Sequence, residues 1–452
     1  MELVPELQDL LDDALRRHDI PGAVVGVARG GERAVAAGGV LNRNTGVAAT
    51  PDSLFQIGSV TKVWTAALVL QLVDEGAVKL DGAVRRYLPE FALPDAAAAE
   101  AVTVRQLLAH TGGFVGDLFE DTGPGDDALE LYLKVLARDA AQVHPPGALI
   151  SYCNSGYCVL GALVARLRGT TWEAALRDRL IDPLGLEQHA LSADEAILFR
   201  TAAGHTKAPG SDRVSVFPRW SMPRSNAPAG ATLCLTAGGL LSFGRMMLDG
   251  GVAGGTRVLS EAAVAAMRTP QIDVPGGGGR RPRHWGLGLM LFDWGTPVYG
   301  HDGGTIGQNT ALRVLPEHDL VVAAVSNGGP YVHLHDEVLA PVLRDLAGVE
   351  LPAYPIPPDP PRPFAGARHA GTYAVPEETW RVSDLGDRLR VTMSPAGRMQ
   401  ALGAAEETLE MVPLDGDTYI ATTAPEGVHP TVTFTDGYLH ASRAIPRADG
   451  DG

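Results

Sequence analysis

A cluster of prolines interrupts this sequence near residue 351. The segment 351–363, LPAYPIPPDPPRP, contains seven prolines. Proline has no backbone N–H and a fixed φ, so the segment cannot be a helix or a central strand and should form a semi-rigid extended spacer. The 452 residues are thereby divided into a large region, 1–350, at the upper end of the usual domain size, and a small one, 364–452. We therefore predict two domains joined by a proline-rich linker.

The large region mixes strand and helix patterns. Apolar runs near both of its ends have strand character, and the stretches between them have helical periodicity and helix-boundary residues. Strands at both ends with helices between them predict an α+β domain, in which an antiparallel sheet packs on a helical region. The expected strands are 22–29, 34–40, 285–292, 309–315 and 320–326, and the expected helices are 59–75, 103–109, 128–138 and 156–168.

The region after the linker has a different pattern. It consists of short β-type runs separated by Gly, Pro and Asp turns, without a helical period. The runs are GTYAV, RLRVTMS, TLEMVPL, TYIATT, PTVTFT and YLHASRA. This pattern predicts a small antiparallel barrel or sandwich.

The charge of the chain argues against two classes of partner. With 37 basic and 53 acidic residues, the formal net charge is -16. Nucleic acids and anionic membrane surfaces both require a basic field, so we expect neither as a partner. Residues 1–22 resemble an acidic amphipathic helix more than a secretory signal, and no apolar run reaches the roughly 20 residues of a membrane span. We therefore expect a cytoplasmic protein.

Lysine is rare in this sequence. Of the 37 basic residues, four are lysines and the remaining 33 are arginines. Arginine stays protonated in proteins and cannot act as a base, whereas a buried lysine can lose its proton. A mechanism that needs a neutral amine therefore has four candidates, namely Lys62, Lys79, Lys134 and Lys207.

Ser59 and Lys62 form the first candidate site. Residues three apart on a helix lie on one face, and Ser59 is a plausible N-cap of the predicted helix 59–75, where free N–H groups favour developing negative charge. A serine hydroxyl is a weak nucleophile until a base removes its proton, and a buried lysine can supply that base. Because S-x-x-K is a common pattern, a coincidental occurrence on an ordinary helix is the alternative.

Two further segments carry candidate residues. Tyr152 and Asn154 lie two apart before a predicted helix, so their side chains can point the same way; an Asn N-cap beside a packed tyrosine is the alternative. The segment Tyr299–Thr305, YGHDGGT, places His301 among glycines that allow a substrate backbone to approach a strand edge. A glycine-rich hairpin with a surface histidine is the alternative there.

Taken together, these segments resemble the serine β-lactamase and penicillin-binding-protein superfamily. Its S-x-x-K, Y-x-N and H-x-G patterns correspond here to Ser59-Lys62, Tyr152-Asn154 and His301-Gly303. The stretches VTVRQLLAHTGGF, PPGALISYCNSGYCVLG and DPLGL are similar to the class C β-lactamase and family VIII esterase branch.

The resemblance implies specific roles for these residues. Ser59 would be the acylated nucleophile, Lys62 and Tyr152 would share the acid and base work, and Asn154 would orient them. The N–H groups of Ser59 and Gly304 would form the oxyanion hole.

The strand that carries His301 is implied to bind substrate. Gly303 and Thr305 are the candidate substrate-binding residues beside it. A histidine at position 301, where lactamases have lysine, argues against efficient β-lactam hydrolysis.

A lipocalin-like barrel after such a domain resembles the penicillin-binding-protein-type thioesterases, the surugamide-type cyclases of nonribosomal peptide assembly. That resemblance implies a linear peptide on the phosphopantetheine arm of a peptidyl carrier protein as substrate, and release by head-to-tail macrolactamisation.

Arg443 and Arg447 would reach substrate carbonyls, although a solvated surface position is the alternative for both. The segment 113–127 would form a cleft rim. A cytoplasmic serine esterase, D-amino-acid peptidase or lactamase-like hydrolase is the other function considered.

No cofactor or metal is expected. His333, His335, Asp336 and Glu337 contain metal-ligand side chains, but their spacing on a predicted helix is typical of a solvated face. The cysteines Cys153 and Cys158 flank the candidate site, and packing is the default interpretation of both.

Overall fold

The computed structural model describes residues 3–207, 213–397, 400, 405–424 and 427–448. Its centre is a nine-stranded antiparallel sheet in the order β11-β12-β13-β14-β15-β16-β1-β2-β3. The first strand of the chain therefore pairs with β16, close to the end of the large domain, as the sequence predicts. The strands are β1 Gly22–Arg29, β2 Glu32–Asn42, β3 Val47–Ala48, β11 Ile272–Asp273, β12 His284–Trp285, β13 Met290–Asp293, β14 Pro297–Thr305, β15 Gln308–Leu315 and β16 Leu320–Ser326.

Helices cover both faces of this sheet. The continuous apolar sequence of β16, LVVAAVS, is buried on both sides. Its alternate residues belong to a core cluster with α1 and α12, and the others belong to the core cluster that contains α2 and α9. The helices are α1 Leu7–Arg17, α2 Thr61–Asp74, α3 Ala96–Ala101, α4 Val104–Leu108, α5 Ala128–Asp139, α6 Asn154–Arg168, α7 Trp172–Leu176, α8 Ala193–Ala196, α9 Ala237–Leu248, α10 Glu261–Met267, α11 Tyr331–Leu334 and α12 Ala340–Ala347. None of the helices in the described ranges combines the length and the apolarity of a membrane span.

Smaller pairings complete the large domain. The short strands form one three-stranded sheet, β4-β8-β5, and two hairpins, β6-β7 and β9-β10. Their bounds are β4 Phe55–Gln56, β5 His189–Ala190, β6 His205–Lys207, β7 Val214–Val216, β8 Cys234–Leu235, β9 Val252–Ala253 and β10 Thr256–Arg257.

The apolar run 285–292, predicted as one strand, is two strands. Residues 286–289 leave the sheet between β12 and β13. Leu287 N–H donates to the Met267 carbonyl at 3.0 Å, and Gly288 N–H donates to the Leu108 carbonyl at 3.2 Å. Leu287 and Leu289 in this excursion are buried in the core of the large domain, which explains why the run is apolar.

The small domain is a nearly closed barrel of eight antiparallel strands in sequential order. The first and last strands are joined by the Tyr373–Arg447 bridge and by a bond from Ala448 N–H to the Thr372 carbonyl at 2.7 Å. The strands are β17 Gly371–Val375, β18 Glu378–Asp384, β19 Leu389–Pro395, β20 Glu407–Asp415, β21 Thr418–Ala421, β22 Thr431–Thr435, β23 Tyr438–His440 and β24 Ala444–Pro446.

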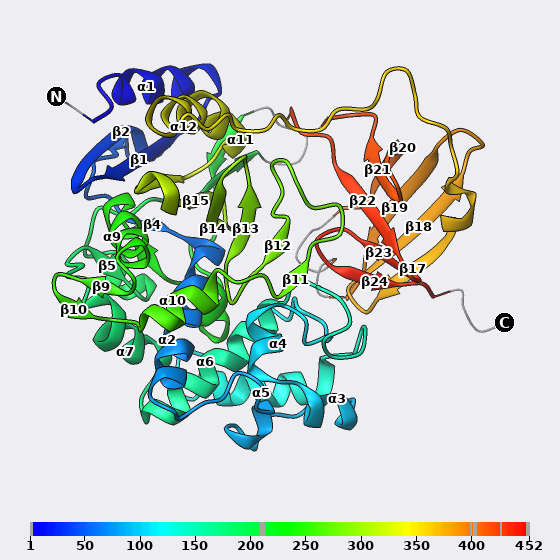
Figure 1. The fold of residues 1–452 in the computed structure, drawn as a ribbon, viewed down its shortest axis with the longest axis horizontal. Helices are drawn as coiled ribbons and strands as arrows, with labels where there is room; N and C mark the ends of the chain where they lie inside the picture. The colour runs from blue at the N-terminus through cyan, green and yellow to red at the C-terminus, as the bar shows by residue number, and fades with distance from the viewer. Residues whose placement is uncertain (1–2, 208–212, 398–399, 401–404, 425–426, 449–452) are drawn as a thin grey trace.

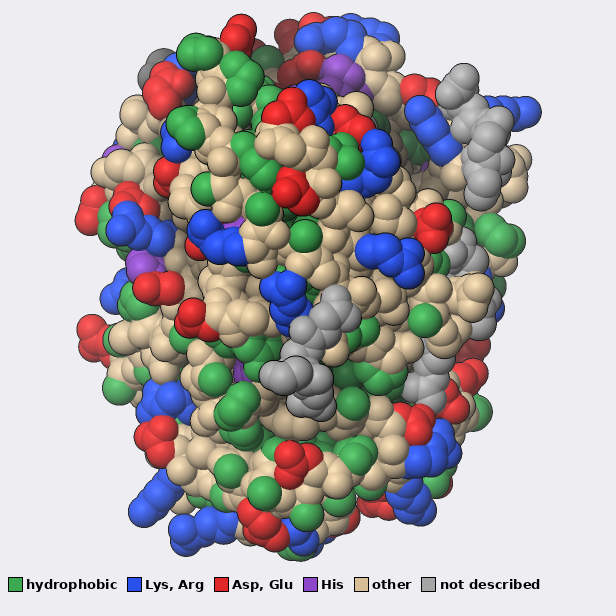
Figure 2. Space-filling view, turned by 90° about the vertical axis from the view of Figure 1, so that its right-hand side faces the viewer, with side chains coloured by type: hydrophobic (Ala, Val, Ile, Leu, Met, Phe, Trp, Pro, Cys, Tyr) green, Lys and Arg blue, Asp and Glu red, His purple; other side chains and the backbone are tan. Residues whose placement is uncertain are grey.

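The sequence predicts only six of the barrel strands. β18 was not predicted, and the run YLHASRA, residues 438–444, is not continuous. It turns at Ser442, which has φ +64°, so that β23 and β24 are separate strands. The linker segment 351–363 contains neither helix nor strand and leads from α12 to the barrel (Figure 1). Acidic and basic side chains are intermingled on the barrel side of the molecule (Figure 2).

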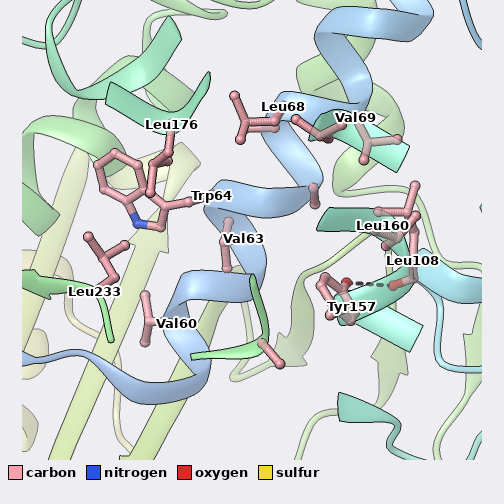
Figure 3. Close-up of a cluster of buried hydrophobic side chains, with 14 of the residues drawn as sticks. Val60, Val63, Trp64, Leu68, Val69, Leu108, Tyr157, Leu160, Leu176 and Leu233 are labelled. Atoms are coloured by element: carbon pink, nitrogen blue, oxygen red, sulfur yellow. Dashed lines mark hydrogen bonds between the residues drawn. The ribbon is translucent and has the colours of Figure 1, made fainter. Parts of the chain in front are cut away.

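Helix α2 is the central element of the large domain's core. Twelve of its residues are buried, including Trp64, Leu68 and Val69, and they contact side chains from α4, α6 and α7 (Figure 3). Trp64 is fully buried, and its ring lies 4.3 Å from that of Phe243 on α9. A helix buried all round is held in one position by its neighbours.

We expect Trp64→Ala to lower the free energy of unfolding by about 3–5 kcal/mol, because it removes a large buried ring and leaves a cavity. Chemical denaturation followed by circular dichroism measures this. The control is Leu198→Ala, at a side chain that is 79% exposed, where we expect a change of no more than about 0.5 kcal/mol. Equal effects of the two variants would contradict the assigned position of α2.

Candidate active site

The chain turns sharply immediately before α2. Gly58 has φ +52°, and a Cβ atom at this position would lie 2.8 Å from the Gly304 carbonyl oxygen. A glycine is therefore required where this turn meets β14. Ser59 follows in the 3₁₀ turn η1, Gly58–Val60. The prediction that Ser59 is an N-cap is wrong, because α2 begins at Thr61 and has no side-chain cap. The hydroxyl is instead bound by Lys62.

Lys62 is a buried amine in direct contact with Ser59. Its Nζ donates to Ser59 Oγ at 2.9 Å and to the Ala229 carbonyl at 2.6 Å. Burial is the main reason that the pKa of Lys62 falls to about 7, and the nearby Arg443 guanidinium adds to the effect. The other three lysines, Lys79, Lys134 and Lys207, are exposed. The structure therefore selects Lys62 from the four candidates as the amine that can be neutral near neutral pH.

Tyr152 completes a group of three side chains. It is hydrogen-bonded to Ser59, and Lys62 Nζ lies 4.9 Å from the centre of its ring. Burial raises the pKa of Tyr152. Lys62 is therefore the better proton acceptor for Ser59, and Tyr152 is suited to donating or relaying a proton.

Asn154 begins helix α6, and its predecessor Cys153 is the N-cap, through Sγ. The Asn154 amide donates to Asp117 Oδ1 at 2.6 Å. Its predicted role was to orient Lys62 and Tyr152, whereas this bond goes to a carboxylate in the segment 113–127. Asp117 also accepts a hydrogen bond from Arg443 Nη2 at 2.9 Å. Asn154 thus helps to fix the ion pair of Asp117 and Arg443 beside the reacting group.

Arg443 reaches this group from the barrel. Its guanidinium carbon lies 5.4 Å from the centre of the Tyr152 ring. The turn that carries it is bound to the chain around Tyr152: Tyr152 N–H donates to the Ser442 carbonyl at 3.1 Å, and Ala444 N–H donates to Ser151 Oγ at 3.2 Å. The barrel therefore contributes directly to the wall of the site.

Arg447 lies elsewhere in the barrel. Its guanidinium donates to the backbone carbonyls of Arg368 and Ala370, and its carbon lies 5.8 Å from the centre of the Tyr373 ring. These contacts join the ends of the barrel. The predicted role of Arg447 at the substrate finds no support in them.

Strand β14 forms the wall opposite Tyr152. Its pairing with β13 ends at Gly300, so residues 301–305 have no β13 partner on that edge. The strand meets the turn before α2 so closely that a Cβ atom on Gly303 would lie 2.0 Å from the Ile57 carbonyl oxygen. Gly304 is exposed, and Thr305 Oγ1 contacts Gln56 and Met222. An extended substrate can therefore lie along this edge.

His301 is fully buried, which excludes the alternative of a surface histidine. Its Nδ1 is hydrogen-bonded to the Asp302 carbonyl, and its ring lies 6.3 Å from that of Tyr152 and 5.5 Å from that of Trp285. Burial and the adjacent Lys62 charge lower the pKa of His301 to about 3. The imidazole is therefore neutral near Lys62, and Lys62 remains the titrating cation of the group.

Sequence reasoning missed three residues of the site. His110 lies under Tyr152 with ring centres 4.4 Å apart, and Trp285 meets the edge of the same ring at 5.7 Å. Asp117 holds Asn154 and Arg443. His110 lies in the family-like stretch VTVRQLLAHTGGF, and Asp117 lies in the predicted rim segment, so the sequence had drawn attention to both regions. The run that begins at Trp285 indicated only a strand.

The segment 333–337 is solvated only in part: Asp336 is exposed, and His333 and Glu337 are half-buried. His335 is buried, and burial lowers its pKa to about 4. His18, His333 and Glu337 place potential ligand atoms within 4.8 Å of one another, but Glu337 is also paired with Arg17 at 2.7 Å.

Cys153 and Cys158 are buried, and burial raises the pKa of each thiol to about 12, in agreement with a packing role.

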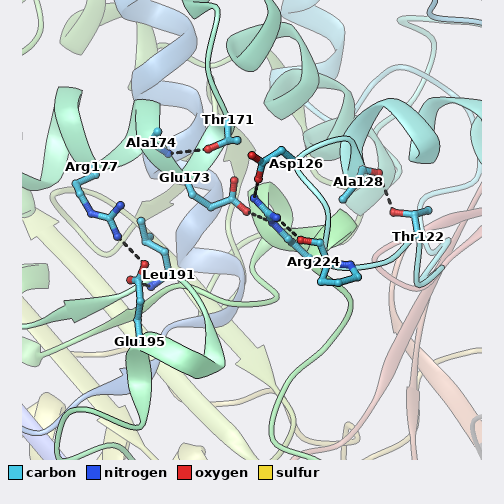
Figure 4. Close-up of polar contacts among 11 residues, drawn as sticks. Thr122, Asp126, Ala128, Thr171, Glu173, Ala174, Arg177, Leu191, Glu195 and Arg224 are labelled. Atoms are coloured by element: carbon cyan, nitrogen blue, oxygen red, sulfur yellow. Dashed lines mark hydrogen bonds and ion pairs between the residues drawn. The ribbon is translucent and has the colours of Figure 1, made fainter.

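Two cavities flank the rim segment 113–127, and Phe119 lines both. The larger, about 980 Å³, reaches Met222 beside Thr305. Two arginines in its wall form ion pairs: Arg224 with Glu173 and Asp126, and Arg177 with Glu195 (Figure 4). The smaller, about 330 Å³, lies between the barrel and Asn154. The segment 113–127 therefore contributes residues to the walls of both cavities.

Comparison with known proteins identifies the family. The beta-lactamase family model matches residues 7–343. This chain belongs to the beta-lactamase family. Within it, Ser59, Lys62 and Tyr152 have the arrangement of a serine acyl-transfer site, with the exposed Gly304 beside Ser59 as the second expected oxyanion-hole residue.

Several relatives show how the family match extends. Penicillin-binding protein 4 of Amycolatopsis lactamdurans is 46% identical over 365 residues, which cover 80% of this chain and 95% of that protein. Esterase EstB of Burkholderia gladioli is 36% identical over 41% of this chain and 50% of its own. The crystal structure of SurE matches 98% of both chains with 30% identity and a TM-score of 0.78, and SurE with D-Leu matches with 28% identity, the same coverage and a TM-score of 0.76. The SurE match therefore includes the barrel.

Lys62→Ala should lower the rate of Ser59 acylation by about 10²–10⁴-fold, because it removes the base that takes the hydroxyl proton. Intact-mass spectrometry after mixing with an activated ester follows the acyl-enzyme. The matched control is Lys134→Ala, an exposed lysine, which should acylate at the wild-type rate. An acyl-enzyme that forms equally fast in both variants would remove Lys62 from the mechanism.

The acylation rate should rise with pH up to about 7 and level off above it. The reason is that the neutral amine is the base, and its fraction grows as the pH approaches the Lys62 pKa of about 7. Stopped-flow release of p-nitrophenol from an ester measures the profile. His301, with its pKa lowered to about 3, should add no inflection in this range. A flat profile through neutral pH is the contrary result.

Proposed function

We propose that this chain is a serine acyltransferase that releases a linear peptide from a thioester by head-to-tail macrolactamisation through acyl-Ser59. The donor would be a peptide on the phosphopantetheine arm of a peptidyl carrier protein, in the cytoplasm. The observation that carries the proposal is the contact of the barrel with the site, where the turn at Ser442 binds Tyr152 and places Arg443 against Asp117.

The chemistry follows from the three side chains. Neutral Lys62 takes the Ser59 proton as Oγ attacks the thioester carbonyl, the C–S bond breaks, and the thiol leaves with a proton returned from Lys62 or Tyr152. The amino group of the peptide then attacks the ester, a C–N bond forms and the C–Oγ bond breaks. The proton lost by the amine returns to Ser59 through the same side chains.

The barrel favours an amine over water as the second nucleophile. Arg443 and the turn beside Tyr152 cover one side of the reacting group, so the barrel reduces the access of bulk water to the ester. The Arg443 guanidinium carries hydrogen-bond donors that can hold a substrate carbonyl in place. The similarity to SurE over the whole chain, and the D-Leu present in one SurE structure, support a peptide with a D residue at its carboxyl end.

A cytoplasmic serine hydrolase acting on esters or D-amino-acid peptides is the second candidate. The 36% identity to an esterase over 198 residues supports it. Both functions share the acyl-enzyme and differ in the group that resolves it.

An N-acetylcysteamine thioester of a linear peptide with a D residue at its carboxyl end distinguishes the two functions. We expect a product with the mass of the substrate less the thiol, because the peptide's own amine resolves the ester. Liquid chromatography with mass spectrometry reads this directly, and Ser59→Ala is the control that should give neither product nor adduct. A product that has gained water would instead favour the hydrolase, and acyl transfer without an adduct on Ser59 would contradict both.

A further inference from the structure

The smaller cavity has a composition that the reaction at Ser59 does not explain. It lies where the barrel meets the large domain and is lined by Asn154, Asp117 and Arg443, the residues that adjoin Tyr152. Its other wall is the β17–β18 hairpin of the barrel, which contributes Glu378 and Trp380. A molecule in this cavity would therefore be next to the catalytic group.

The charge of the cavity favours a cation. Three carboxylates, those of Asp117, Glu377 and Glu378, and one guanidinium line it. Asp117 is paired with Arg443, and the Glu378 carboxylate adds negative charge beside that pair. An anionic group would meet repulsion here, whereas an ammonium would be attracted.

Glu378 is placed to bind such a group. It is half-buried beside Trp380 in the cavity wall, and burial raises its pKa. A carboxylate deprived of solvent gains from a cation that enters its cavity. The tight turn at Pro376 and Glu377 fixes its position, since Ala396 N–H donates to the Glu377 carbonyl at 2.7 Å.

The rest of the lining suits an amino-acid side chain. Apolar groups come from both domains, including Val115 and Val143 of the large domain and Val375 and Ile445 of the barrel. The Trp380 ring offers an aromatic face to a cation or an apolar chain. The volume of about 330 Å³ is at the lower end of ligand pockets, which suits one residue better than a long peptide.

We propose that this cavity binds the amino-terminal residue of the substrate peptide, with the Glu378 carboxylate accepting hydrogen bonds from its ammonium group. The assignment rests on the proposed function: the bound ammonium first gives one proton to the Glu378 carboxylate, which later releases it to solvent, and the resulting neutral amine attacks acyl-Ser59. The larger cavity, on the other side of Phe119, is left for the rest of the peptide. Specificity for the first residue then resides in the barrel.

Binding can be tested without turnover. In the Ser59→Ala background, leucyl-alaninamide and its N-acetyl counterpart are titrated by calorimetry. We expect the free amine to bind and the acetylated ligand to bind at least 10-fold more weakly. Adding Glu378→Gln should weaken binding of the free amine at least 10-fold, whereas Glu407→Gln, at an exposed barrel glutamate, should leave it unchanged. Equal binding of the two ligands, or no binding of the free amine, would overturn the proposal.

A second measurement separates this inference from the proposed function. Thermal melting shows whether the Glu378→Gln variant is folded. If it is not, the comparison of the free and acetylated ligands in the Ser59→Ala protein decides whether the cavity binds the amine. With Ser59 present and a peptide thioester as substrate, Glu378→Gln should lower the ratio of cyclic to hydrolysed product, whereas Glu407→Gln, outside the cavity, should leave that ratio and the acylation rate unchanged. If the wild-type protein makes no cyclic product although the free amine binds selectively, the proposed function fails and the cavity assignment stands.

Discussion

The contact between the Lys62 amine and the Ser59 hydroxyl determines what the rest of the structure must provide. An amine removed from water loses solvation, and two hydrogen bonds, to Ser59 and to the Ala229 carbonyl, compensate in part. The same burial lowers the pKa of Lys62 to about 7. The apolar surroundings of α2 are therefore part of the catalytic apparatus, because a more solvated helix would leave Lys62 protonated and Ser59 unactivated.

The barrel acts on this group through one turn. Ser442 is bound by Tyr152 N–H, and Arg443 forms an ion pair with Asp117, which also holds Asn154. A domain that could have been a separate attachment thus supplies part of the wall around the reacting atoms. The linker 351–363 therefore matters for the site, because it must allow the barrel to dock on the side of the large domain where Tyr152 lies.

The rim segment 113–127 contributes to the walls of two cavities, one that reaches Met222 beside Thr305 and one that adjoins Asn154 and Arg443. Ion pairs such as that of Arg224 with Glu173 lie in the wall of the larger cavity, and the barrel contributes Glu377 and Glu378 to the wall of the smaller one. A reaction that joins the two ends of one molecule needs separate places for those ends. The two cavities therefore agree with the chemistry proposed for Ser59.

The sequence by itself determined the division at the prolines, the sheet built from both ends of the large domain, and the Ser59–Lys62 pair, because all three depend on local conformation or periodicity. The scarcity of lysine also pointed to Lys62 before any geometry was available. Only the tertiary structure decided that Tyr152, His110 and Trp285 lie together at the site and that Asn154 bonds to Asp117. It also decided that Arg443 lies at the site whereas Arg447 lies elsewhere in the barrel. The reason is physical: Asp117 and Arg443 are 326 residues apart, and their meeting depends on how the barrel docks, for which local periodicity carries no signal.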